Sequence, residues 1–318
     1  MRRIFAAALA ALAASLAAHA EDFPSRPVRI VVPWPPAGNI DLTARALAPA
    51  LGEALGQQVI VDNRGGAGGR IGTAEVARST PDGYTLLLGS SGTLTTGPAV
   101  FRNIAYDPIR DFVAVGAIQS VPIVLTVGPK TPAKSYQEFM ALAKTHEVTI
   151  ASAGNGSSNH LASELFMRMA NVKLLHVPYK GSGPALTDLV GGQVESMMDQ
   201  LSASIPYVRE GRLRALAISS PRRSPLLPEV PTFEELGVKG YEASTFTGLF
   251  APAGVPAPVL EKLATALGKA LADENVRERY RSMGADMLDL GRAEFAAYVR
   301  SDLEKWRRVA RDGHIAVD

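Results

Sequence analysis

The residues best suited to bind a ligand lie in two glycine-containing loops, each between an apolar run and a helical pattern. The first loop, residues 34–41 (Trp-Pro-Pro-Ala-Gly-Asn-Ile-Asp), follows the run Val28–Val32 and opens a helix that the pattern predicts to begin near Leu42. Asp41 or Asn39 is placed to cap this helix. Because free amides and the positive end of the dipole attract anions at a helix N-terminus, this loop predicts a seat for a carboxylate.

The second loop, residues 152–160 (Ser-Ala-Gly-Asn-Gly-Ser-Ser-Asn-His), has the same arrangement. It follows the run Val148–Ala151 and leads into a helical pattern over residues 161–169. The hydroxyl groups of Ser157 and Ser158, with successive amides, are able to hold a second anionic or polar group. Since the two loops are expected in different domains, they are placed to close on one ligand from opposite sides.

Short apolar runs bounded by Gly, Pro, Asn or Asp alternate with helical patterns along the chain. Such alternation predicts an α/β fold with parallel-rich sheets and helices on both faces. In sheets of this kind ligands bind beyond the carboxyl ends of the strands, where both loops fall. Pro49, inside the first helical pattern, predicts that this helix is kinked or shortened. The predicted strands are Val28–Val32, Val59–Val61, Tyr84–Leu88, Val148–Ala151, Leu174–Val177 and Leu213–Ile218, with a further strand near Val194–Met198.

Sequence motifs for catalysis, nucleotides and metals are missing. A third glycine-rich run, residues 65–72, lacks the spacing of a dinucleotide-binding fingerprint, because the glycine required at position 71 is Ile71. The chain contains no P-loop, no G-x-S-x-G and no H-E-x-x-H motif, and its histidines are scattered. We therefore expect no enzyme, no metal site and no cofactor. A secreted hydrolase of small esters stays as an alternative, which turnover of generic esters would reveal.

The composition is that of a globular protein, with 47% hydrophobic and 20% charged residues among 318. It excludes a disordered or collagen-like chain. The absence of cysteine excludes disulfides, thiol nucleophiles and cysteine-ligated metals. The 33 Lys and Arg residues nearly balance the 31 Asp and Glu residues, which argues against a nucleic-acid partner.

The first twenty residues have the pattern of a secretory signal peptide. Arginines at positions 2 and 3 precede an apolar run over residues 4–18, and the segment ends in Ala-His-Ala at 18–20. This run is about 15 residues long, which is short for a membrane span of roughly 20. We therefore predict cleavage after Ala20 and export to the periplasm, with an uncleaved N-terminal anchor as the alternative. Removal of both arginines leaves a net charge of zero.

Further motifs appear along the chain after the first loop, and together they are specific. With the two loops, they resemble the Bug family, the extracytoplasmic substrate-binding proteins of tripartite tricarboxylate transporters. The motifs span essentially the whole chain after residue 20. They are Val-Asp-Asn-Arg-Gly-Gly-Ala-Gly-Gly at 61–69, Pro-Asp-Gly-Tyr-Thr-Leu at 81–86, His-Val-Pro-Tyr-Lys-Gly at 176–181, Gly-Gly-Gln-Val at 191–194, Pro-Thr-Phe-Glu-Glu-Leu-Gly at 231–237 and Ala-Pro-Ala-Gly-Val-Pro at 251–256.

The resemblance implies a two-domain periplasmic binding protein of type II-like fold. Two segments cross between the domains and form a hinge, and the ligand lies in the cleft. With a signal peptide at 1–20, we expect domain I at 21–122 plus 246–318 and domain II at 123–245. The resemblance also implies that backbone amides and ordered water, rather than a buried arginine, hold a ligand carboxylate.

Position in the predicted strands adds residues to the two loops. Ser90, Ser91, Tyr179 and Lys180 follow strand ends, and Lys180 adds positive charge. Asp199 either accepts a ligand amino group or hydroxyl or caps a helix. The predicted ligand-binding residues are Trp34, Pro36, Ala37, Gly38, Asn39, Ile40, Asp41, Ser90, Ser91, Ala153, Gly154, Asn155, Gly156, Ser157, Ser158, Tyr179, Lys180 and Asp199.

The function that the resemblance implies is that of a receptor without catalysis. It captures a small carboxylate-bearing solute and delivers it, as a monomer, to the integral membrane permease of a tripartite transporter. A ligand-sensing module for a membrane sensor kinase is the alternative, which neighbouring genes would distinguish. Family members often have Gly-Gly where this chain has Ala37 and Gly38, and a small or hydroxylated residue in place of Ile40. Trp34 and Ile40 favour a partly apolar monocarboxylate or aromatic acid, while dicarboxylates, tricarboxylates and acidic amino acids stay open.

Overall fold

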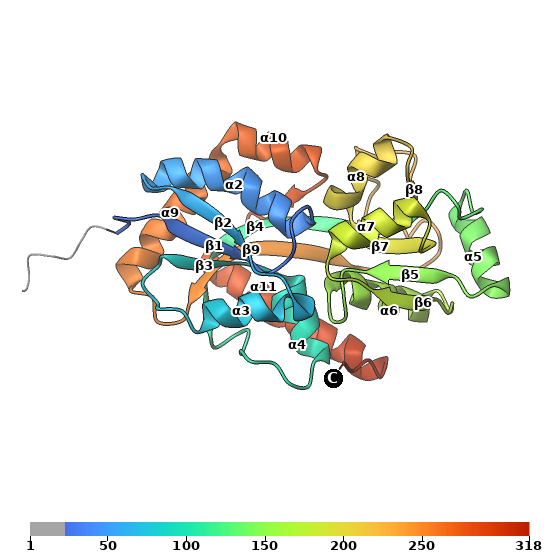
Figure 1. Ribbon diagram of the computed structural model, residues 1–318, viewed down its shortest axis with the longest axis horizontal. Coiled ribbons are helices and arrows are strands. Elements are labelled where there is room, and N and C mark those ends of the chain that lie inside the picture. Colours follow the sequence, from blue (N-terminus) through green and yellow to red (C-terminus); the bar gives the residue numbers. More distant parts are fainter. Residues whose placement is uncertain (1–22, 318) are drawn as a thin grey trace, which may run out of the picture.

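The computed structural model describes residues 23–317, and in it helices cover both faces of a curled, mixed sheet (Figure 1). The predicted signal peptide, residues 1–20, lies outside the described residues. The strands run in the order β2-β1-β3-β9-β4-β7-β5-β6, with β8 and β10 also paired to β4. The strands are β1 (Val28–Val32), β2 (Val59–Asn63), β3 (Thr85–Ser90), β4 (Phe112–Val127), β5 (Thr149–Ser152), β6 (Leu175–Pro178), β7 (Ser196–Gln200), β8 (Arg214–Ile218), β9 (Ser244–Pro252) and β10 (Asp286–Met287).

The helices follow the strands in alternation through most of the chain, which confirms the α/β prediction. Pro49 lies inside α2, yet this helix continues without interruption to Leu55, so the predicted shortening is wrong. The helices are α2 (Asn39–Leu55), η1 (Ala67–Gly69), α3 (Arg70–Ala77), η2 (Gly92–Thr96), α4 (Gly97–Val100), α5 (Tyr136–Thr145), α6 (Ser158–Met169), α7 (Ser182–Gly191), α8 (Leu201–Arg209), α9 (Ala257–Ala272), α10 (Glu274–Ser282) and α11 (Arg292–Asp312).

Two groups of elements, which we call the first and second lobes, lie side by side in Figure 1. The first lobe contains β1–β3, β9 and β10 with α2, α3, α9 and α10, and the second contains β5–β8 with α5–α8. Parallel pairing is confined to β1 with β2 and β3, and to β5 with β6 and β7. The sheet is mixed because β4 and β9 pair antiparallel with their neighbours.

The long strand β4 connects the lobes. Up to Pro122 it pairs with β9, and from Ile123 onward it pairs with β7, with β8 joining at Val124. The chain returns to the first lobe where β9 begins, at Ser244. The predicted domain borders, 122/123 and 245/246, fall at these two crossings, and the division itself stays a prediction.

Side chains alternate between the two faces of the first-lobe sheet, as a period of two requires. Ile30 and Val32 of β1 pack in the core beneath α2, α9 and α10. Val31, between them, packs on the other face in a core with Phe250 of β9 and Phe295 of α11. Burial on both faces explains why this short strand is apolar throughout.

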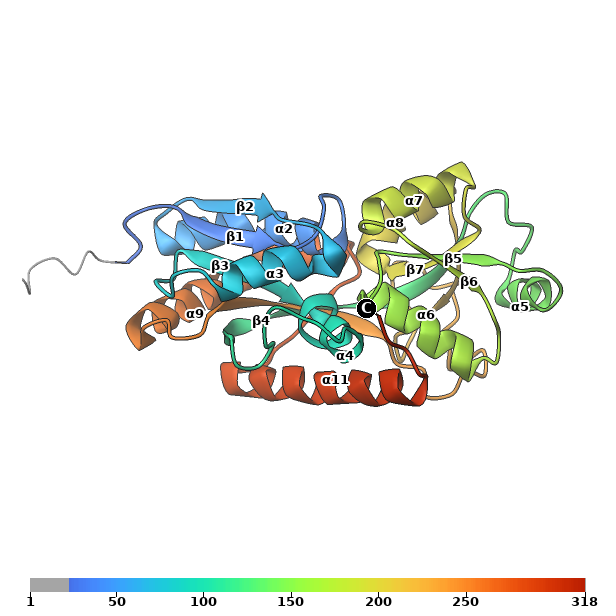
Figure 2. The same ribbon diagram turned by 60° about the horizontal axis from the view of Figure 1, so that its bottom comes forward.

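Helix α11 packs against both lobes. Phe295 and Val299, near its start, belong to the first-lobe core beside β9. Trp306 and Ala310, two to three turns later, belong to the second-lobe core with Phe166 of α6. Figure 2 shows the helix running along the edge of the molecule, from beneath β4 to beneath α6. One helix thus contributes to the cores of both lobes.

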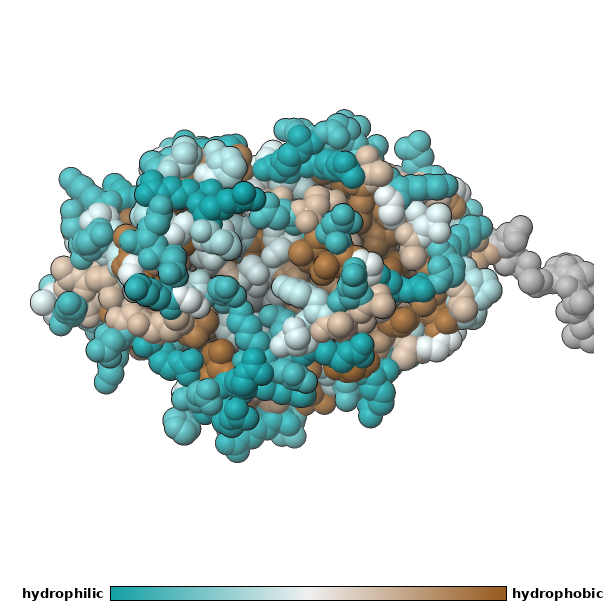
Figure 3. All heavy atoms as spheres, turned by 180° about the vertical axis from the view of Figure 1, so that it is seen from behind, coloured by the Kyte–Doolittle hydropathy of each residue, from teal (hydrophilic) through white to brown (hydrophobic). Residues whose placement is uncertain are grey.

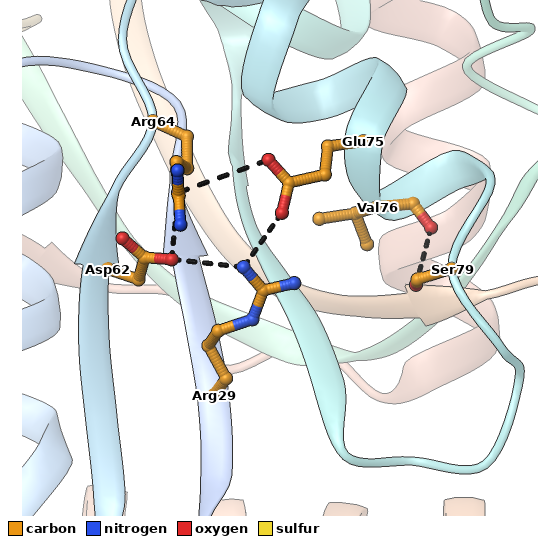
Figure 4. A network of polar contacts seen from close by, with 6 residues as sticks. All are labelled: Arg29, Asp62, Arg64, Glu75, Val76 and Ser79. Atoms are coloured by element: carbon orange, nitrogen blue, oxygen red, sulfur yellow. Dashed lines mark hydrogen bonds and ion pairs between the residues drawn. The ribbon is translucent and has the colours of Figure 1, made fainter.

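Four charged side chains fix α3 over the edge of the first-lobe sheet (Figure 4). The guanidinium of Arg29, on β1, contacts Asp62 on β2 at 2.9 Å and Glu75 on α3 at 2.7 Å. Arg64 contacts the same Asp62 carboxylate at 2.9 Å. Burial opposes ionisation of Asp62, but hydrogen bonds from Arg64 and Arg29 outweigh it and hold the pKa of this carboxyl below its usual value. The network positions the loop that precedes α3.

Hydrophilic residues form most of the rim of the face in Figure 3, and paler and apolar residues gather around its middle. Among residues 23–317, no helix combines the length and apolar character needed to cross a membrane.

Candidate functional site

The first loop ends in the N-terminus of α2, which begins at Asn39, three residues before the predicted start. Gly38 is the N-cap residue and no side chain caps the helix, so the predicted cap by Asp41 or Asn39 is wrong. The Asp41 carboxylate accepts hydrogen bonds from Ala37 N, Arg45 Nε and Asn63 Nδ2, each at 3.0 Å. Asp41 therefore holds the loop from behind. The first amides of α2 have no partners within the helix, as at any helix N-terminus.

Burial acts against the charge of Asp41, but its donors decide the result. The hydrogen bonds from Arg45, Ala37 and Asn63 keep the pKa of this carboxyl below its ordinary value. Asp41 therefore remains an ionised hydrogen-bond acceptor at neutral pH and keeps its hydrogen bonds to the loop.

The orientation of the Asn39 amide follows from its neighbours. The Thr43 hydroxyl donates to Asn39 O at 2.8 Å, so the Gln119 atom that contacts Thr43 must be the donor Nε2. Gln119 Nε2 also faces Asn39 Oδ1, to which Ser202 Oγ donates at 2.7 Å. Asn39 Nδ2 is left without a partner, although the residue is only 3% exposed. This donor is available to a ligand.

The second loop leads into α6 in the same way. Ser157 is the N-cap residue, and its hydroxyl accepts from His160 N at 3.2 Å. The first amides of α6, at Ser158 and Asn159, have no partner within the helix. Gly154 (φ 121°) and Gly156 (φ 74°) adopt backbone conformations that favour glycine. The loop therefore presents the N-terminus of α6 toward the first lobe.

A small cavity of about 30 Å³ lies between the N-termini of α2 and α6. That volume holds one or two water molecules, so the two lobes are closed on each other. The lining residues in the described part of the chain are all uncharged: Trp34, Pro35, Gly38, Asn39, Ile40, Ser90, Ala153, Ser158, Asn159, Ser182, Gln200 and Thr245.

A larger chamber of about 470 Å³ adjoins this cavity and shares Trp34, Pro35 and Ala153 with it. Its walls come from the glycine-rich run Gly66–Arg70 in the first lobe and from residues 153–155 and 178–180 in the second. A Cβ atom built on Gly68 would lie 2.7 Å from Asn155 O, so the two loops approach closely only because residue 68 is glycine. The glycine-rich run, which lacks the dinucleotide-binding spacing, therefore lines this chamber.

Hydrogen bonds join the lobes around the cavity. The Thr96 hydroxyl donates to Gly156 O at 3.0 Å, and the Thr245 hydroxyl donates to Ser158 Oγ at 2.9 Å. With the Ser202–Asn39 bond, these contacts link both loops to the opposite lobe.

Asp199, at the end of β7, is fully buried behind the cavity. Its Oδ1 accepts from Ser182 Oγ at 2.8 Å and Asn159 Nδ2 at 2.7 Å, and its Oδ2 accepts from Ser204 Oγ at 3.3 Å. Burial raises the pKa of this carboxyl to about 6, although these donors and the Gln200 amide act in the opposite direction. Asp199 therefore reaches the cavity only through Ser182 and Asn159.

Two stacked histidines support the second loop from below. The rings of His160 and His176 lie 4.2 Å apart, and His160 Nδ1 accepts from Gly156 N at 3.2 Å. Burial, with the neighbouring His160 ring, lowers the pKa of His176 to about 4. The His176 ring is therefore neutral at neutral pH, and the stacked pair supports the loop. In residues 23–317, no cluster of His, Asp or Glu side chains is arranged to hold a metal ion.

The structure separates the predicted residues into groups. Pro36 and Ala37 are exposed and line neither space. Ser91 Oγ accepts a hydrogen bond from Phe246 N at 3.0 Å. Tyr179 donates to Asp188 at 2.8 Å and lines the larger chamber with Lys180. The small cavity, here the inner cavity, is lined by the predicted residues Trp34, Gly38, Asn39, Ile40, Ser90, Ala153 and Ser158. The larger chamber, here the outer chamber, is also lined by Gly154, Asn155, Tyr179 and Lys180. The predicted residues that lie behind these walls are Asp41, Ser91, Gly156, Ser157 and Asp199.

Five residues that line the cavity were not predicted: Pro35, Asn159, Ser182, Gln200 and Thr245. Pro35 and Asn159 lie within the two loops, so the loop pattern itself was a signal for them. Gln200 is the last residue of β7, and Ser182 is the first residue of α7, after the loop that follows β6. Thr245 lies on β9, and no strand was predicted over these residues from the sequence.

The closed cavity between two α/β lobes, with crossing strands beside it, is the architecture of a periplasmic binding protein. The solved structure of the periplasmic binding protein BugD superposes with a TM-score of 0.89, at 36% identity over 92% of this chain and 99% of that chain. Residues 43–314 match the family described as the tripartite tricarboxylate transporter family receptor. The chain belongs to this family of solute-binding receptors, which confirms the predicted resemblance and the prediction that it is not an enzyme.

Other relatives, two of them solved with a bound ligand, are similar over nearly the same length. Protein BugT of Bordetella pertussis is 38% identical over 92% of this chain and 91% of its own. A Rhodopseudomonas palustris protein, Rpa4515, solved with adipate, has a TM-score of 0.89 and 35% identity over 93% of this chain and 99% of that one. The malate-bound MatC protein of the same organism has a TM-score of 0.86 and 36% identity over 90% and 99%. Members of the family thus bind carboxylates.

Proposed function

We propose that this protein captures a small organic acid between its lobes, with the carboxylate in the small cavity and the rest of the ligand in the adjoining chamber, and delivers it to the membrane permease of a tripartite tricarboxylate-type transporter. The observation that carries the proposal is the meeting of two helix N-termini, from α2 and α6, at one uncharged cavity. Their free amides and the unpartnered Asn39 Nδ2 are donors, and donors of this kind stabilise a carboxylate.

Binding of this kind closes the protein, because the carboxylate contacts both lobes. A ligand that touched one lobe only would not shift the balance between open and closed forms. The bonds from Thr96 to Gly156 and from Ser202 to Asn39 form on closure and add to this difference. The bound, closed form is then the one that the permease recognises.

The proposal extends to the chain as a whole. Residues 1–20 act as a signal peptide that is cleaved after Ala20, and the mature protein works as a monomer in the periplasm. The chain divides into domain I, residues 21–122 plus 246–318, and domain II, residues 123–245. The change of partner along β4 at Ile123 supports the first border, and the similarity to periplasmic binding proteins supports the location.

The test is calorimetric titration of residues 21–318 with organic acids and with their uncharged amides. We expect binding of one acid class and none of its amide. Asn39→Asp places a like charge in the cavity and removes the donor, so affinity should fall about 10- to 100-fold. Asn275→Asp is the control, because Asn275 lies in the first turn of α10, away from the cavity. Equal binding of acids and amides, or an unaffected Asn39→Asp variant that is folded, would reject the proposal.

A further inference from the structure

On the second-lobe wall of the cavity, the side chains of Ser182 and Asn159 present hydrogen-bond acceptors and no donors. The Ser182 hydroxyl gives its single hydrogen to Asp199 Oδ1. The Asn159 amide gives one hydrogen to the same oxygen and the other to Met198 O, at 2.7 Å and 2.9 Å. What these two side chains present to the cavity is therefore lone pairs.

The direction of these hydrogen bonds is fixed by Asp199. An ionised carboxylate only accepts, and this one is fully buried. The side chains in contact with it, from α6, α7 and α8, are Asn159, Ser182 and Ser204, and none of them titrates. In the described part of the chain no basic side chain forms an ion pair with it. The charge of Asp199 is therefore stabilised by hydrogen-bond donors alone, and each donor must keep its hydrogen directed at the carboxylate.

The opposite wall presents donors, in contrast to the side chains of Ser182 and Asn159, while the start of α6 on the second-lobe wall adds its own backbone amides. The opposite wall carries the unpartnered Asn39 Nδ2 and the first amides of α2. Ser182 lies directly across from this helix N-terminus, because a Cβ atom built on Gly38 would be 3.9 Å from Ser182 Cβ. A ligand carboxylate held by α2 therefore has the acceptor Ser182 Oγ beside it, within reach of the adjoining carbon of the ligand.

We propose that the site selects organic acids that carry a hydrogen-bond donor, a hydroxyl or an ammonium, on the carbon next to the carboxylate, and that Ser182 Oγ accepts this hydrogen. Asp199 is a positioning residue that holds Ser182 as an acceptor. This inference rests on the proposed carboxylate function and narrows its ligand class. The rest of the ligand extends past Trp34 and Pro35 into the outer chamber.

The test compares acids that differ by one group: lactate with propionate, malate with succinate, and alanine with propionate. Calorimetric titration of the mature protein at pH 7.5 should show that a donor-bearing acid binds about 5- to 10-fold more tightly than its partner, as one hydrogen bond predicts. The lactate and alanine arms separate hydroxyl from ammonium. In Ser182→Ala the ratio should fall to near one, while the affinity of the acid without the donor stays within about 3-fold.

The matched control is Ser204→Ala, because Ser204 donates to the same carboxylate but does not line the cavity. Its ratio should equal that of the wild type. A pH profile tests the role of Asp199. Protonation, at a pKa of about 6, releases Ser182 from donating, so the ratio should decline as the pH falls from 7.5 to 5 in the wild type and stay constant in Asp199→Asn.

Two results would overturn the inference and leave the proposed function intact: equal affinity for both members of every pair, or a preference that survives Ser182→Ala. Binding of none of these acids, together with none of a wider carboxylate panel, would instead reject the proposed function. If Asp199→Asn does not fold, the pH profile of the wild type against Ser182→Ala gives the same decision.

Discussion

The difference in unfolding free energy between the Asp199→Asn variant and the wild type should depend strongly on pH. The folded state raises the pKa of this carboxyl from 3.8 to about 6, because the group is buried. A shift of about two pH units corresponds to about 3 kcal/mol of unfolding free energy, at 1.36 kcal/mol per unit. The side chain is fully buried, so solvent screening does not reduce this figure.

The sign follows from which state holds the proton. Between pH 4 and 6 the folded state keeps a proton on Asp199 that the unfolded state has already lost. The wild type therefore loses unfolding free energy as the pH rises toward 6. Asp199→Asn does not titrate at this position, so it has no such loss. Hydrogen bonds that the asparagine fails to replace shift the variant by an amount independent of pH. Relative to the wild type, the variant should gain about 2.4 kcal/mol between pH 4 and pH 7, because an unfolded pKa of 3.8 places the first part of the change below pH 4.

The assay is urea unfolding of both proteins at pH 4, 5, 6, 7 and 8, followed by fluorescence, after removal of bound ligand by unfolding and refolding. The wild-type profile alone is not informative. The pKa of His176 is lowered to about 4, so its contribution is lost as the pH falls below 6.5 and opposes that of Asp199. The difference between the two proteins cancels His176. A difference that stays within about 0.5 kcal/mol from pH 4 to pH 7, about a fifth of the expected change, would refute the reasoning.

Three further substitutions test other parts of the site and the fold. Asp41→Ala should weaken ligand binding by about 1–2 kcal/mol in calorimetry, because it releases the Ala37 amide and the loop; unchanged affinity in a folded variant would contradict this role. Gly92→Ala would place a Cβ atom 2.8 Å from the Trp34 ring, so both melting temperature and affinity should fall, whereas Gly268→Ala, which has open space around it, should be neutral or up to about 1 kcal/mol more stable. Trp306→Ala, in the second-lobe part of α11, should cost about 3–5 kcal/mol in urea unfolding, and a loss below about 1 kcal/mol would show that α11 does not brace that lobe.

Much of the fold could be predicted because its strands are short, apolar and buried on both faces. The predicted strand at Val28–Val32 agrees with β1 at both ends, and the alternation with helices gave the class of fold. The strand β4 was missed because Pro122 and Gly116 interrupt it, and both residues argue against a central strand. The structure places Pro122 where β4 leaves β9 for β7, so its lack of an amide hydrogen coincides with a change of partner.

The two loops of the site could be predicted from local sequence, since a helix N-terminus is a local feature. The direct role predicted for Asp199 as a ligand contact stays untested, and its burial behind Ser182 depends on how α7 packs on β7. Thr245 enters the cavity only because β9 returns between β3 and β4. Such neighbours are decided by the order of strands in the sheet, which no local pattern contains.

The place of β9 has a consequence for how the chain folds. The strands of the second lobe come from one uninterrupted stretch of sequence, so they are able to pair as soon as that stretch is available, and α11 completes the core of this lobe later. The strands of the first lobe do not, because β9 fills the gap between β3 and β4, and the chain reaches β9 only after the strands of the second lobe. Until then β3 has an unpaired edge, the kind of surface that invites aggregation. We therefore expect refolding in two phases, with contacts within residues 123–245 formed first and the long-range pairing of β9 limiting the rate.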